Sequence, residues 1–398
     1  MVVYRPRILD GKEWYILMSA IKRIFLFADW YEPGYKAGGP IRSCVNFAHH
    51  MQGDYQVYVF TTDRDLNSTT PYEGIPVNEW VTGAGGEKVY YGSPEMLNWG
   101  NISRQIKAIA PDFIYLNSMF SLKFTIFPLL ISRSQRWRGK IILSPRGMLR
   151  SSAVEFKPLK KKIFLTVFRL LGFSGKLWFL ASDDTEEKDV KRYFGSHVHV
   201  VLIPNFPSAL PAKPEIAEKK KGELSLLFIG RVHPIKNPDY LLNVLKDVKA
   251  NIRLTIVGSC EDKNFWRQCE EMISTLPANI RVTYAGEMPN HELPGITALH
   301  HIFTLPTRGE NFGHAIFEAL TLGKPVLISD QTPWRHLIGK KAGWDLPLDR
   351  PDGFRQVIEE VAAFDQQEYT SWCLATRKYM EDYLSKLNTK DEYLKLFC

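Results

Sequence analysis

Short apolar runs alternate with amphipathic stretches along most of the chain. Runs of buried-strand character cover residues 23–29, 55–61, 111–116, 140–143, 178–182 and 198–203 in the first half, and 224–229, 253–257, 282–285, 302–305 and 326–328 in the second. Between them apolar positions recur at helical spacing, as in 41–51 and 313–323. Strands that alternate with helices predict an α/β fold with mainly parallel sheets.

One stretch interrupts this alternation. Residues 206–223 are rich in proline, alanine and lysine without periodicity, which is typical of a linker. We therefore predict a first lobe at 1–205, a linker at 206–223, a second lobe at 224–372 and a helical tail at 373–398 that crosses back to the first lobe. Residues 1–17 precede a more natural beginning at Met18, and we interpret them as an upstream extension.

Composition narrows the class of protein. With 398 residues, 45% hydrophobic and 24% charged, the chain is globular and large enough for two cores. No apolar run approaches the ~20 residues that span a bilayer. Five scattered cysteines show neither metal-ligand spacing nor a disulfide framework, which favours a reducing, cytoplasmic compartment. The net charge of +8 indicates an anionic partner, and without a recognition motif nucleic acid is not expected.

The most basic apolar stretch is Lys157–Phe173, which mixes five cations with nine large apolar residues. One interpretation is a domain helix that buries one side and keeps its lysines in water. The other is an interfacial helix on anionic lipid, which would place the protein at the inner face of the cytoplasmic membrane. The sequence leaves both open.

The candidate chemistry lies in loops at predicted strand ends. After the run 302–305, the chain reads Arg308-Gly-Glu-Asn-Phe-Gly313 and then becomes helical. A loop that enters a helix N-terminus binds anions through its free backbone N–H groups, here those of Asn311, Phe312 and Gly313. Glu310 in this loop and Glu318 in the helix suit the hydroxyls of the same ligand.

A second loop supplies cations. Arg231 and Lys236 follow Gly230 at the end of the run 224–229, and such side chains bind phosphate oxygens. Two cations, a helix N-terminus and two carboxylates match a nucleotide-diphosphate sugar, with the phosphates on the cations and amides, the ribose on Glu318 and the transferred sugar on Glu310. His314, one turn before Glu318, is a further candidate for donor contact.

Taken together, these motifs resemble glycosyltransferase family 4, the retaining enzymes with two Rossmann-like lobes of the GT-B fold facing across a cleft, in its bacterial polysaccharide and lipopolysaccharide branch. The resemblance covers roughly residues 24–334. It rests on Pro33-Gly-Tyr-Lys-Ala-Gly-Gly39, Ser144-Pro-Arg-Gly-Met-Leu149, Ile203-Pro-Asn205, Gly230-Arg-Val-His-Pro-Ile-Lys-Asn237 and Pro306-Thr-Arg-Gly-Glu-Asn-Phe-Gly313 through Glu318.

The resemblance implies a glycosyltransferase that moves a sugar from a nucleotide-diphosphate sugar to a glycan or lipid-linked acceptor. A UDP-sugar is the first expectation for the donor and a GDP-sugar the second. It implies catalytic roles for Glu310, Arg231 and Lys236, and first-lobe cleft positions for Gly38, Gly39, Arg146 and Asn117. Many members carry a histidine where this chain has Pro145-Arg146-Gly147. Arg146 cannot replace it as a base, because guanidinium stays protonated.

The expected mechanism is same-face substitution with retention, without metal or cofactor, since no carboxylate cluster near the loops resembles a metal-binding pair. Three alternatives remain: a sugar-nucleotide epimerase, a phosphorylase, and a non-catalytic sugar-nucleotide-binding protein. An epimerase would act on the donor alone, without an acceptor.

Overall fold

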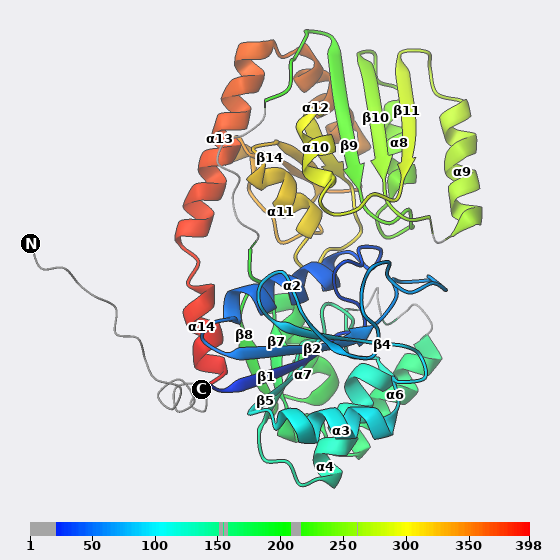
Figure 1. Cartoon of the computed structure of the whole chain (residues 1–398). Coiled ribbons are helices and arrows are strands. Elements are labelled where there is room, and N and C mark those ends of the chain that lie inside the picture. Colours follow the sequence, from blue (N-terminus) through cyan, green and yellow to red (C-terminus); the bar gives the residue numbers. More distant parts are fainter. Residues whose placement is uncertain (1–20, 151–153, 155–157, 208–215, 261) are drawn as a thin grey trace, which may run out of the picture.

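The computed structural model describes the chain except for residues 1–20, 151–153, 155–157, 208–215 and 261. The predicted extension at 1–17 and part of the predicted linker lie outside the described residues. Two lobes stacked one above the other, each built on its own sheet, make up the described chain (Figure 1). Both sheets are flanked by helices, as the alternation of strands and helices predicts.

In the first lobe, eight strands of the described chain form a sheet in the order β3-β4-β2-β1-β5-β6-β7-β8, parallel except for the β3–β4 pair. The strands are β1 (Arg23–Phe27), β2 (Gln56–Thr62), β3 (Trp80–Thr82), β4 (Lys88–Gly92), β5 (Phe113–Leu116), β6 (Lys140–Leu143), β7 (Trp178–Ala181) and β8 (His199–Leu202). The helices are α2 (Gly39–Met51), α3 (Trp99–Ile109), the π-helical turn η1 (Leu122–Ile126), α4 (Phe127–Ser134), α6 (Pro158–Leu170), the 3₁₀ turn η2 (Ser174–Lys176) and α7 (Asp184–Phe194).

Side chains of the first sheet alternate between two cores. In β1, Ile24 and Leu26 enter one apolar cluster, which includes residues of α2, while Phe25 and Phe27 enter the other, which includes residues of α3, α4 and α6. All four are fully buried. Because successive side chains of a strand point to opposite faces and both faces are covered, the strand is a continuous apolar run.

In the second lobe, six parallel strands of the described chain take the order β11-β10-β9-β12-β13-β14. They are β9 (Glu223–Ile229), β10 (Asn251–Val257), β11 (Ile280–Gly286), β12 (Ile302–Leu305), β13 (Val326–Ser329) and β14 (Gly343–Leu346). The helices are α8 (Pro238–Leu245), α9 (Lys263–Ser274), α10 (Leu293–Ala298), α11 (His314–Thr321), η3 (Ile338–Lys340), α12 (Pro351–Ala363) and α13 (Gln366–Ser385). The chain ends with α14 (Thr389–Leu396).

The C-terminal helices tie the lobes together. α13 runs along the second lobe toward the first, and α14 packs on the first lobe (Figure 1). The ring of Phe397 lies 5.5 Å from that of Phe47 and 5.2 Å from that of Phe113, and Tyr55 Oη donates to its carbonyl oxygen (2.8 Å). The predicted return of the tail to the first lobe is confirmed. The predicted domain boundary at 372/373 falls inside α13.

No helix in the described part of the chain is both long and apolar enough to cross a membrane.

Candidate active site

Two loops of the second lobe meet at the carboxyl edge of its sheet. β9 and β12 are neighbours, so the loops 230–237 and 306–313 leave the same edge. Their backbones are tied together, because the N–H of Arg308 donates to the carbonyl of Ile235 (2.7 Å) and the side-chain amide of Asn237 donates to the carbonyl of Pro306 (3.0 Å). The order of the strands therefore joins the two predicted halves of a donor site.

Lys236 and Glu310 form an ion pair where these loops meet. Their side chains are 19% and 10% exposed, so solvent screens this pair less than a surface pair. The backbone N–H of Glu310 donates to the carbonyl of Gln331 (3.1 Å), which fixes the loop that carries the carboxylate. A predicted phosphate-binding cation and a predicted sugar-binding carboxylate thus lie in contact.

The two glycine-bearing ends of these loops have distinct geometries. Gly230 precedes the exposed Arg231, and a Cβ added to the neighbouring Gly258, whose φ is +145°, would lie 2.0 Å from the Gly230 carbonyl oxygen. Gly313, with φ of 74°, is the N-cap of α11. Gly258 and Gly313 are the positions that require glycine, and the missing side chain of Gly258 lets the backbone at Gly230 pass close beside it.

Phe312 is one of the predicted donor residues, and the structure buries its ring. The ring is buried against Phe317 and Trp334, and the indole N–H of Trp334 donates to the Phe312 carbonyl (2.7 Å). This packing sets the direction in which the chain enters α11. Only the backbone N–H of Phe312 is then available to a ligand.

The first turns of α11 face α2 of the first lobe. Nε2 of His314 lies 2.9 Å from Oγ of Ser43, and Nε of Arg42 donates to Oε1 of Glu318 (3.0 Å). Burial, followed by the charges of nearby arginines, lowers the pKa of His314 to about 3, so its imidazole is neutral at pH 7. Burial also raises the pKa of Glu318, although Arg42 opposes this shift.

The predicted glycines of the first lobe lie at the start of α2. Gly38 has φ of 66°, in the left-handed region that glycine adopts readily. A Cβ on Gly39 would lie 3.0 Å from the ring of His314, so the absence of a side chain permits this close approach. The structure therefore places Gly39 against the predicted donor helix, while Gly38 forms the N-cap of α2.

Asn311 also connects the loop to the first lobe. Its side-chain amide donates to Oγ of Ser182 (2.8 Å), and its oxygen accepts from Arg150 (3.3 Å). A Cβ on Gly147, where φ is +73°, would lie 3.2 Å from Cβ of Asn311. The loop 306–313 is thus held between the lobes.

Arg146 is bound within its own lobe. Its guanidinium donates to Oδ1 of Asn117 (2.7 Å), to the hydroxyl of Tyr115 (2.6 Å) and to the side chain of Asn205. Asn117 itself is buried, with an exposed fraction of 4%. The guanidinium contributes to the low pKa of His314, which places its charge near α11.

Sequence reasoning missed four residues that contact the predicted donor helix and loop: Arg42, Ser43, Arg150 and Ser182. A signal for the first two was available. They lie in the first turns of the helix after Gly38-Gly39-Pro40, the same arrangement of loop and helix that marked Gly313. Nothing in the sequence pattern points to Arg150 or Ser182.

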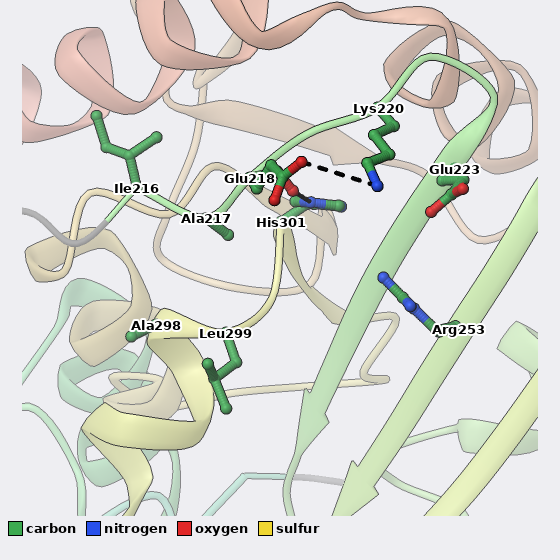
Figure 2. Close-up of a pocket in the computed structure, with 9 residues that line it drawn as sticks. All are labelled: Ile216, Ala217, Glu218, Lys220, Glu223, Arg253, Ala298, Leu299 and His301. Carbon is green, nitrogen blue, oxygen red and sulfur yellow. Dashed lines mark hydrogen bonds and ion pairs between the residues drawn. The ribbon is translucent and has the colours of Figure 1, made fainter.

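A separate hollow of about 420 Å³, drawn in Figure 2, lies near the amino ends of β9 and β10. Glu218 and Lys220 pair across 3.8 Å, and His301 accepts from the N–H of Ser225 (2.9 Å) while its Nε2 lies 2.8 Å from the Glu218 carbonyl oxygen. Burial lowers the pKa of His301 to about 4. Ligands of parallel sheets bind at the carboxyl ends of strands, so this hollow is on the wrong edge for the donor.

Among the described residues, one group could hold a metal ion: Glu32, His49 and Glu87, whose ligand atoms lie within 4.8 Å of one another. The neighbouring carboxylates of Glu32 and Glu87 raise the pKa of His49 to about 9, so a protonated imidazole already balances one of their charges at pH 7. None of the three belongs to the loops 230–237 and 306–313.

Comparison with known proteins identifies the class of the second lobe. Residues 211–365 match the family described as Glycosyl transferases group 1. This stretch contains both loops of the candidate site. The second lobe is therefore similar to group 1 glycosyl transferase domains.

Two proteins of similar sequence match parts of this chain. A protein from Klebsiella pneumoniae, "Uncharacterized 41.2 kDa protein in cps region", is 26% identical over 231 residues, 55% of this chain and 60% of that protein. O-antigen chain mannosyltransferase B of Escherichia coli is 32% identical over 119 residues, 28% of this chain and 30% of that protein. The chain thus matches less than two thirds of the length of either relative.

Among solved structures, Anabaena Alr3699/HepE in complex with UDP-glucose superposes with a TM-score of 0.61 at 14% identity, over 92% of this chain and 100% of that chain. The similarity extends over both lobes. It confirms the GT-B fold.

Proposed function

We propose that this protein is a retaining glycosyltransferase that transfers a sugar from a nucleotide-diphosphate sugar to a hydroxyl of a growing glycan or lipid-linked oligosaccharide in bacterial surface polysaccharide biosynthesis. A UDP-sugar is the first choice of donor and a GDP-sugar the second. The group 1 domain supports the reaction class. The UDP-glucose complex of the HepE neighbour and the O-antigen relative support the donor and the pathway.

The contact between Lys236 and Glu310 carries the proposal. A donor brings an anion for the ammonium group and hydroxyls for the carboxylate, and both protein groups lie at one sheet edge beside the N-terminus of α11. In the proposed complex the diphosphate replaces Glu310 as the partner of Lys236, and Arg231 adds a second cation. Glu310 then accepts from the hydroxyls of the transferred sugar.

Same-face substitution fits the residues of these loops. Retention through a covalent intermediate needs two carboxyl groups about 5 Å apart, and the loops 230–237 and 306–313 contain Glu310 alone. In the proposed step the bond between the anomeric carbon and the diphosphate oxygen breaks. The acceptor oxygen bonds to the same face of that carbon, and its proton passes to the leaving diphosphate. Lys236, Arg231 and the amides of α11 stabilise the departing charge.

Glu318 and His314 are assigned to the donor in the same proposal. Glu318 is to accept from ribose hydroxyls, for which it must exchange its contact with Arg42. His314 stays neutral at pH 7 and can donate or accept one hydrogen bond without adding charge.

The test is a thermal-shift and hydrolysis screen against a panel of UDP-, GDP- and ADP-sugars. At a hundredfold excess over its dissociation constant, a donor stabilises the folded protein by about 2.7 kcal/mol. Lys236→Gln reduces the shift at the same donor concentration, whereas Lys246→Gln, which changes an exposed lysine at the end of α8, leaves it unchanged. A panel in which no nucleotide sugar raises the melting temperature contradicts the proposal.

A further inference from the structure

α6 exposes an apolar stripe, which we define as Leu159, Ile163, Val167 and Leu170. Their exposed fractions are 72, 56, 47 and 81%. Spacings of four, four and three residues place them along one side of the helix. The opposite side is buried in the first-lobe core. Both sides of α6 are therefore apolar, and only one is covered.

Positive charge borders this α6 stripe. At about 100° per residue, Lys162 and Arg169 fall along one edge of the stripe and Lys160 along the other, and all three are exposed. α6 contains no aspartate or glutamate. The exposed Lys176 follows in η2.

The surface continues onto the neighbouring turn η1. The ring of Phe164 in α6 lies 5.2 Å from that of Phe120, and the ammonium group of Lys161 lies 5.3 Å from the same ring. Two residues further along, Leu122 is 58% exposed. α6 shares its core cluster with α3 and α4, whereas α14 packs on the other face of the sheet (Figure 1). The C-terminal tail therefore leaves the α6 stripe uncovered.

We propose that the α6 stripe docks on an anionic lipid bilayer, with its apolar side chains at the boundary between headgroups and acyl chains and its lysines among the headgroup phosphates. A helix with an apolar centre and cations along its edges has the chemistry of an in-plane membrane helix. A second copy of this surface would place like charges opposite one another, which disfavours a dimer through the stripe. The net charge of +8 attracts the chain to the same surface.

The experiment is co-sedimentation of the full chain with vesicles of phosphatidylglycerol mixed with phosphatidylcholine, against vesicles of phosphatidylcholine alone. Wild type binds the anionic vesicles, and added salt weakens binding. Lys160→Gln/Lys162→Gln lowers the partition coefficient about 30-fold, as expected for two basic residues at a lipid surface. Ile163→Gln/Leu170→Gln lowers it at least as much, because binding scales with buried apolar area.

Matched controls are Leu299→Gln, an apolar side chain 75% exposed on the second lobe, and Lys378→Gln, 70% exposed on α13. Both retain wild-type binding. Because every changed side chain is exposed, the melting temperatures of all variants stay close to that of wild type. Equal binding to both kinds of vesicle, no binding to either, or equal loss in the controls overturns the proposal. So does a dimer in light scattering that the stripe variants dissociate.

Discussion

Removing either charge of the Lys236–Glu310 pair is expected to change the affinity for a nucleoside diphosphate in opposite directions. Lys236→Gln removes the ammonium group that is proposed to bind the diphosphate. Glu310→Gln keeps the shape of the side chain but removes the anion that now neutralises Lys236 and would repel the ligand. A pair that merely stabilises the fold would give no such difference in sign.

The expected changes in affinity depend on how little solvent reaches the Lys236–Glu310 pair, whose side chains are 19% and 10% exposed. Two unit charges 4 Å apart interact by about 4 kcal/mol at an effective dielectric constant of ~20, before desolvation. Net values for a hydrogen bond to a charged group are about 1.5–3 kcal/mol, so Lys236→Gln should weaken UDP binding by roughly 10- to 100-fold. Glu310→Gln should strengthen UDP binding by up to about tenfold, while turnover falls by about 10²- to 10³-fold.

Isothermal titration calorimetry with UDP, or with GDP if the donor screen selects guanosine, measures the affinities, and initial rates with the matching sugar nucleotide measure turnover. Circular dichroism melts of both variants verify that each is folded at the assay temperature. If both substitutions weaken nucleotide binding equally, or if Glu310→Gln lowers stability as much as turnover, the pair has a structural role and the reasoning is refuted.

Three further predictions concern pH, the lobe contact and metal. The carboxylates of Glu32 and Glu87 raise the pKa of His49 to about 9. Protonated His49 therefore stabilises the fold fully below pH 6.5, and this contribution is lost as pH rises through 9. The free energy of unfolding, measured with denaturant, should fall more steeply over that pH range in wild type than in His49→Asn. Arg42→Ala removes the ion pair with Glu318, which is worth about 1 kcal/mol for a partly exposed pair. Amide hydrogen exchange in the first turns of α2 and α11 should therefore become about fivefold faster. Unchanged exchange would show that this contact does not hold the lobes together. Chelator treatment should leave transfer rates unchanged, and activity lost to chelator and restored by manganese would refute metal independence.

Much of the fold could be predicted because strands buried on both faces are readable as apolar runs. The run at 23–29 corresponds to β1, whose alternate side chains enter two different cores. The order of the strands within each sheet could not be predicted from the sequence pattern. The sequence pattern does not say that β9 lies beside β12, yet this adjacency brings Lys236 to Glu310.

The local elements that carry the candidate site residues could be predicted from the sequence, but the contacts between distant residues could not. The predicted loop and helix around Gly313 and Glu318 correspond to the loop that ends at Gly313 and to α11. The partner of Glu318 is Arg42, 276 positions away, and no local pattern specifies that pairing. The guanidinium of Arg146 was placed in the cleft from its loop, but its bonds to Asn117 and Tyr115 depend on how β5 and β6 pair.

The central claim is that a sugar leaves a nucleotide diphosphate and joins an acceptor hydroxyl with its configuration kept. The most direct measurement is proton NMR of a reaction that contains the donor selected by the screen and a glycan acceptor. The account predicts one nucleoside diphosphate released per glycosidic bond formed, a product with the anomeric configuration of the donor, and no change in the donor when the acceptor is omitted. An inverted product, or a donor converted without an acceptor, would contradict it.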